Sequence, residues 1–120
     1  MILLNETQTM EPIELRIEKL LMALHVPAHL KGYRYLARAI AFTMEDESCL
    51  RSVMTALYGR IAKDFRTTVH SVERNARTAI HQIPKDAYQS VFTAGDLQDG
   101  RALTVSTFIS LCVLKLRYLD

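Results

Sequence analysis

Apolar side chains recur three and four residues apart along most of the chain, which is the spacing of one face of an α-helix. Nowhere do apolar and polar residues alternate over a run long enough for a β-strand, and no segment repeats. The pattern therefore predicts an all-α protein, a compact bundle of about six helices. The helices are expected over residues 11–25, 33–44, 50–57, 58–65, 69–83, 86–92 and 104–119.

Prolines, a glycine and a threonine mark where these helices should begin, bend or end. Pro12 suits the first turn of a helix, and Pro27 ends that helix because a proline removes a backbone donor. Gly59 is expected to break or bend the chain. Pro84 is placed to begin a short helix, and Thr104 to cap the last one.

Residues 58–83 show the pattern of a helix-turn-helix. A short helix (58–65) is followed by the polar turn Arg-Thr-Thr (66–68) and by a longer helix, about 68–83 with its cap. Either Thr67 or Thr68 could cap that second helix, since a threonine oxygen accepts from a free backbone N–H of the first turn.

The second helix of this unit has one apolar and one basic face. At about 100° per residue, its apolar residues cover roughly a third of the circumference. His70, Arg74, Arg77 and His81 lie on the opposite side, within about 60° of one another. Ser71 and Thr78 flank that face on one edge, and Glu73 lies on the other edge.

Charge is distributed unevenly, although the net charge of +2 is small. Residues 1–18 carry four glutamates and one arginine, whereas residues 60–81 carry five basic and two acidic side chains. A basic stretch of this kind fits a polyanion, and arginine can donate two hydrogen bonds to guanine, but it also fits a solvated helix face. Glu73 and Arg77 are spaced as an ordinary surface ion pair.

Other chemistry finds little support in the sequence. His25 and His29 are separated by Pro27, and His70 and His81 are about 16 Å apart along one helix, so no metal site is expected. No catalytic set, phosphate loop, signal peptide or membrane-spanning run is present in the sequence, and we expect no enzyme activity, cofactor or small-molecule substrate. Two cysteines are typical of a protein in the reducing cytoplasm.

Three segments resemble one known family. The stretches VPAHLKGYRYLARAI (26–40), LYGRIAKDFRTTVHSVERNARTAI (57–80) and TFISLCVLKLR (107–117) are similar to the C-terminal effector domain of the master response regulator of sporulation initiation in Firmicutes. That resemblance implies an all-α domain that binds double-stranded DNA as a homodimer on tandem sites and regulates transcription. It also implies that the second helix of the motif enters the major groove.

The resemblance implies roles for individual residues. Glu73, Arg74 and Arg77 match the family's base-contacting pattern, while Ser71 and Thr78 stand where the family usually has arginine and histidine. The predicted base-contacting set is His70, Ser71, Glu73, Arg74, Arg77 and Thr78. The predicted phosphate-contacting set is Arg66, Thr67, Thr68 and Arg101.

We therefore expect residues 1–10 to be a tail and residues 11–120 to be a sequence-specific DNA-binding regulator. The family's usual receiver domain has no counterpart among these 120 residues, which fits either an excised effector domain or a stand-alone relative. The alternative function is a protein-interaction module that dimerises with or titrates a full-length regulator without reading DNA. Ser71 and Thr78 keep that alternative open.

Overall fold

Helices make up nearly all of the structure, a computed structural model that describes residues 11–46, 54–92 and 104–119. These residues form six α-helices and a π-helical turn, and they contain no strand, so the prediction of an all-α bundle is confirmed. The elements are α2 (Ile13–Ala23), α3 (Lys31–Glu45), α5 (Met54–Asp64), α6 (Val69–His81), α7 (Lys85–Val91), α8 (Val105–Leu114) and η1 (Lys115–Leu119).

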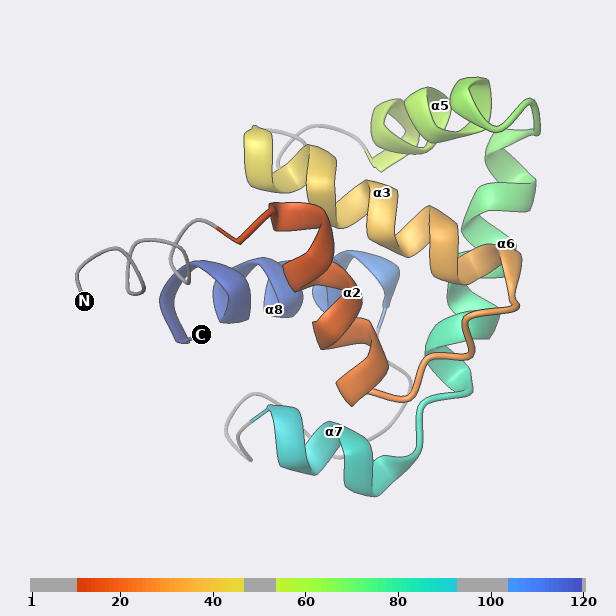
Figure 1. Ribbon diagram of the computed structural model, residues 1–120. Coiled ribbons are helices and arrows are strands. Elements are labelled where there is room, and N and C mark those ends of the chain that lie inside the picture. Colours follow the sequence, from red (N-terminus) through yellow and green to blue (C-terminus); the bar gives the residue numbers. More distant parts are fainter. Residues whose placement is uncertain (1–10, 47–53, 93–103, 120) are drawn as a thin grey trace.

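Helix α3 lies at the centre of the bundle and packs against α2, α5, α6 and α8 (Figure 1). Its core positions, among them Leu36 and Ile40, are buried. Helix α6 comes unusually close to the first turn of α3 at Gly32. A Cβ atom added to Gly32 would lie 2.1 Å from the backbone oxygen of Asn75, so only glycine fits there. This close approach fixes the position of α6 relative to α3.

The helix α2 ends in a Schellman motif. His25 has a positive φ of 61°, and the N–H groups of His25 and Val26 donate to the carbonyls of Met22 and Leu21. These two backbone bonds reverse the chain before Pro27.

Pro84 precedes α7, and Thr104 caps α8 by accepting from the N–H of Thr107, as the sequence predicts.

Gly59 is expected to break or bend the chain, and a break at this glycine is wrong. Helix α5 runs without interruption from Met54 to Asp64 through this glycine. A glycine within a helix costs about 1 kcal/mol relative to alanine. Here the buried neighbours Leu57, Tyr58 and Ile61 offset that cost by packing one face of α5 onto the core.

The last predicted helix changes its winding. It is α-helical to Leu114 and continues as the π-helical turn η1. In this final stretch, where carbonyls lack partners within the helix, Arg16 of α2 donates to the carbonyl of Leu116. Arg117 in turn donates to the carbonyl of Met44 at 2.7 Å, so the end of the chain is bonded to both α2 and α3.

Some predictions fall on other parts of the chain. The tail at 1–10, the start of the helix predicted over 50–57, and Arg101 lie outside the described residues. Across the described ranges, no helix has the length and apolar character needed to cross a lipid bilayer.

Candidate nucleic-acid interface

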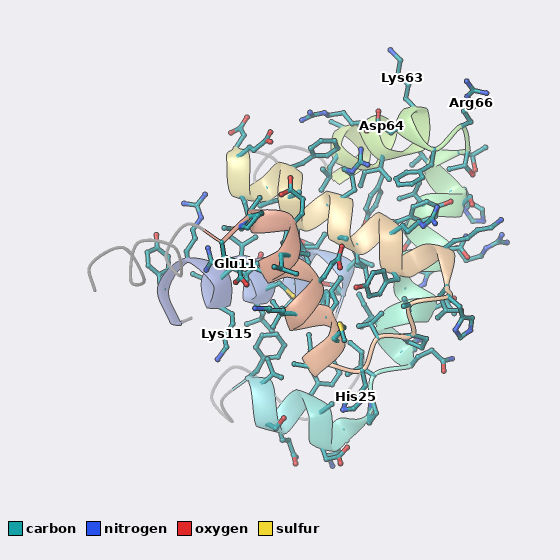
Figure 2. All side chains as sticks on the ribbon, in the orientation of Figure 1. Glu11, His25, Lys63, Asp64, Arg66 and Lys115 are labelled. Carbon is teal, nitrogen blue, oxygen red and sulfur yellow. The ribbon has the colours of Figure 1, made fainter. Side chains whose placement is uncertain are left out.

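The turn between α5 and α6 is built by a second Schellman motif. Arg66 adopts a left-handed conformation with φ of 55°, and its N–H donates to the carbonyl of Lys63 at 3.3 Å. The N–H of Thr67 donates to the carbonyl of Ala62 at 2.9 Å. Figure 2 shows Arg66 directed outward at the same end of the molecule as Lys63, so the turn carries an exposed cation.

Thr68 begins α6. Its extended backbone places the side-chain oxygen where it accepts from the N–H of Ser71 at 3.0 Å. Of the two threonines that could cap this helix, the structure therefore selects Thr68. The hydroxyl hydrogen of Thr68, which is exposed, can still be donated to another acceptor.

One face of α6 is locked into the core. Val72, Ala76, Ala79 and Ile80 are buried, and the helix packs against α3, α5 and α8. Small alanines at two of these positions allow the neighbouring backbones to come close. The helix therefore cannot rotate about its axis without disrupting the packing of the core.

The opposite face of α6 is open to solvent. His70, Arg74, Arg77, Thr78 and His81 are all exposed. The helical periodicity predicts this division into two faces, and the structure confirms it. Two guanidinium groups, two imidazoles and a hydroxyl are thus presented outward from a rigid support.

Glu73 and Arg77 form the ion pair that their spacing predicts. The Arg77 Nη1 to Glu73 Oε2 distance is 2.9 Å, and both side chains remain partly exposed. An exposed pair of this kind stabilises a helix by only about 0.3–0.5 kcal/mol. The carboxylate also holds one edge of the Arg77 guanidinium in a defined direction.

Tyr58 of α5 lies near this ion pair. Burial raises the pKa of its phenol to about 12, and the negative charge of Glu73 adds to the increase while Arg77 opposes it. The phenol is neutral at physiological pH, and its side chain belongs to the buried core.

Ser71 is more constrained than the sequence indicates. The Nδ2 group of Asn75 donates to the Ser71 carbonyl at 2.7 Å and to its hydroxyl oxygen at 3.2 Å. Ser71 is only partly exposed. Asn75 is absent from the predicted site residues. It lies one helical turn after Ser71, and this i to i+4 spacing of two polar residues was the available signal.

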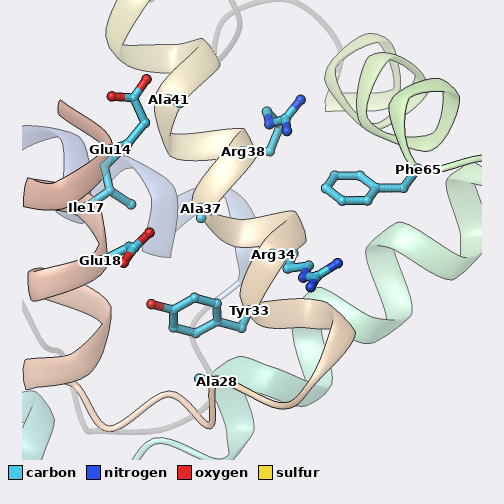
Figure 3. Close-up of a pocket in the computed structure, with 10 residues that line it drawn as sticks. All are labelled: Glu14, Ile17, Glu18, Ala28, Tyr33, Arg34, Ala37, Arg38, Ala41 and Phe65. Atoms are coloured by element: carbon cyan, nitrogen blue, oxygen red, sulfur yellow. The ribbon is translucent and has the colours of Figure 1, made fainter. Parts of the chain in front are cut away.

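Aromatic and basic side chains fasten the end of α5 to α3. Arg38 pairs with Asp64 at 2.9 Å and lies 5.3 Å from the centre of the Phe65 ring. Phe65 also meets Tyr35 edge-to-face, with ring centres 5.2 Å apart. Figure 3 shows Phe65 directed from the end of α5 toward α3. The start of the turn is therefore anchored.

Among the described residues, no group of three or more histidine, cysteine, aspartate or glutamate side chains could hold a metal ion. The basic groups are arranged in a different way: they lie along the outer face of α6 and at the turn that precedes it.

Helix α5, the tight turn and α6 form a helix-turn-helix, in which α6 buries one face and exposes a basic one. The sequence matches the family Sporulation initiation factor Spo0A C terminal over residues 17–116. The chain belongs to this family of DNA-binding effector domains of a sporulation regulator. The match extends from α2 to η1 and confirms the resemblance seen in the sequence.

Proposed function

We propose that this domain regulates transcription by reading a specific sequence of double-stranded DNA, with α6 as the recognition helix in the major groove. The observation that carries the proposal is the exposed basic face of α6, opposite a face that is buried in the core. A major groove about 12 Å wide accepts one α-helix, and side chains on its outward face then meet the base edges.

Arg74 and Arg77 are the principal base-reading residues in this proposal. Each guanidinium can donate two hydrogen bonds to a guanine. The ion pair with Glu73 orients Arg77 before binding, and the second Glu73 oxygen can accept from a cytosine amino group. His70, Ser71 and Thr78 border the same face and complete the proposed base-contacting set.

Phosphate contacts are proposed at the turn and the start of α6. Arg66 carries an exposed cation, and Thr67 and Thr68 bring hydroxyl donors to the same place. Arg101, outside the described residues, is proposed for the same role from the family resemblance alone. These contacts would fix the position of α6 along the groove without selecting a sequence.

Pairing of two domains on tandem sites is also proposed. Leu114 and Tyr118 near the end of the chain are large apolar side chains that are 50% and 69% exposed. Two such side chains one turn apart could meet a second copy of the domain once DNA brings both copies together. The proposed location is the cytoplasm, where a bacterial regulator meets its DNA.

The test is a selection from random duplexes with the purified chain, followed by titration of the selected box against a scrambled duplex. Arg74→Ala and Arg77→Ala are each expected to lose about 1–3 kcal/mol of preference for the box. Lys85→Ala, an exposed change on α7, is the control and should keep that preference. Wild-type affinity and preference in both arginine variants would refute the proposed recognition face.

A selection that yields no preferred sequence would favour the alternative function, a module that pairs with a full-length regulator. The hydrogen bonds that hold Ser71 within α6 agree with that alternative, because they reduce the reach of its side chain. Capture of a regulator of the same family by the purified chain would then be the positive result.

A further inference from the structure

A second concentration of basic groups lies beside the turn, on a different helix from the recognition face. A hollow of about 280 Å³ opens between the first turns of α3 and the α5–α6 turn. We call it the turn pocket; it is lined by Lys31, Arg34, Tyr35, Phe65, Arg66 and Thr67.

The turn pocket carries three cations and no carboxylate in its lining. Lys31, Arg34 and Arg66 are all exposed, and the structure gives none of them an ion pair within the described part of the chain. Three positive groups held together without a counter-charge repel one another. An anion placed between them removes that repulsion and gains charge-assisted hydrogen bonds.

Arg34 also borders a larger groove between α2 and α3, which contains Glu14 and Glu18. Figure 3 shows both carboxylates on the α2 wall, while Arg34 extends from α3 toward the side of α5 and α6. The guanidinium of Arg34 is therefore directed to the side of α3 where the turn pocket opens, away from these carboxylates.

Packing contacts hold the aromatic floor of the turn pocket and the backbone around it in place. Phe65 and Tyr35 meet edge-to-face at 5.2 Å and form an apolar floor. The close approach of Gly32 to Asn75 fixes the start of α3, and with it Lys31, against α6. The backbone that carries Lys31 and Arg34 is therefore fixed relative to α6.

We propose that the turn pocket binds a backbone phosphate of the DNA duplex, with Lys31 and Arg34 of α3 as donors beside Arg66 and Thr67. The inference rests on the proposed function. A helix that enters a major groove is flanked by the phosphates of that groove, and the turn pocket adjoins the end of α6 that follows the turn. The first turns of α3 thus become part of the DNA-binding surface.

The experiment compares two double variants that remove the same amount of charge. Lys31→Gln with Arg34→Gln alters the turn pocket, whereas Lys85→Gln with Lys115→Gln alters α7 and η1. Figure 2 shows Lys115 far from Arg66. Affinity for the selected box and for a scrambled duplex is measured over a series of salt concentrations, after circular dichroism has confirmed that both variants fold.

The turn-pocket variant is expected to bind both duplexes more weakly by a similar factor, on the order of tenfold, and to keep its preference for the box. Its slope of log affinity against log salt concentration should become shallower by about 0.9 for each phosphate that the variant no longer neutralises. The control variant should change the slope by less than half as much.

Equal slopes and affinities in the two double variants would overturn this inference. The proposed function would still stand in that case, provided that Arg74→Ala loses its preference for the box. A parent protein that binds no duplex would overturn both proposals. A turn-pocket variant that loses preference for the box, with an unchanged salt slope, would also contradict the phosphate assignment.

Discussion

Tyr58 of α5 lies close enough to the Glu73–Arg77 ion pair of α6 for both charges to affect the pKa of its phenol. Its phenol has a pKa raised from 10.0 to about 12, so the folded protein holds that proton more tightly than the unfolded chain. The resulting contribution to stability is complete below pH 10 and is lost as the pH rises through 12.

Replacing Tyr58 with phenylalanine should therefore reduce the fall in unfolding free energy between pH 10 and pH 12. The measurement is denaturant unfolding at a series of alkaline pH values. An identical profile for parent and Tyr58→Phe would contradict the argument.

Two glycines give opposite predictions for the same substitution. Gly32→Ala places a Cβ atom 2.1 Å from the backbone oxygen of Asn75, so α3 and α6 must separate, at a cost of about 1–3 kcal/mol or more. Gly59→Ala meets no atom within 4 Å in the interior of α5 and should stabilise the protein by about 0.5–1 kcal/mol. Urea unfolding of both variants measures the difference, and equal effects would show that α3 and α6 are not in close contact.

At the scale of elements, the two Schellman motifs each contain one non-glycine residue with a left-handed backbone, so the same substitution can be compared at both. Arg66 and His25 both have left-handed backbones at the ends of helices, which costs a non-glycine residue about 1–2 kcal/mol. Glycine removes that cost, but it also increases the conformational entropy of the unfolded chain, which lowers the free energy of unfolding and offsets part of the stabilisation. Glycine at either position should therefore stabilise the protein by up to about 1 kcal/mol.

The two variants should differ in DNA binding. Arg66→Gly removes a cation from the turn and should weaken binding to every duplex and lower the dependence on salt, whereas His25→Gly should bind as the parent does. Thermal unfolding and salt-dependent titration measure the two effects separately. If Arg66→Gly bound DNA as tightly as His25→Gly, the role of Arg66 at a phosphate would be wrong.

Periodicity predicts the helices well because each of them buries one face. The buried residues of α6 lie on the apolar face that its periodicity predicts, and both α6 and α8 begin at a predicted threonine cap. The prediction fails at Gly59, where the local preference of one residue is outweighed by the packing of its neighbours. The switch to a π-helical turn near the C-terminus likewise has no signal in the local sequence.

At the scale of the whole molecule, α8 carries a probe of global unfolding. Cys112 is fully buried in the core, and burial raises the pKa of its thiol. Reaction with a thiol reagent therefore requires the core to open and the thiol to ionise.

In a Cys49→Ser variant, labelling of Cys112 should be slow in buffer and should accelerate with denaturant in parallel with global unfolding. The selected duplex should slow labelling further, because a ligand that binds only the folded state stabilises it. A mass-spectrometric time course measures the rate. Rapid labelling in buffer would show that α8 opens without the rest of the core.

The sequence by itself determined the helices, the two faces of α6 and the family, because each depends on the order of residues within one segment. It also contained the cations of α3 but gave them no role, since Lys31 and Arg34 lie more than thirty residues from the turn that they adjoin. Only the tertiary structure brought these segments together, through the close packing of α3 on α6 at Gly32. Contacts between distant segments depend on how complete helices pack, and that packing cannot be read from the period of any one of them.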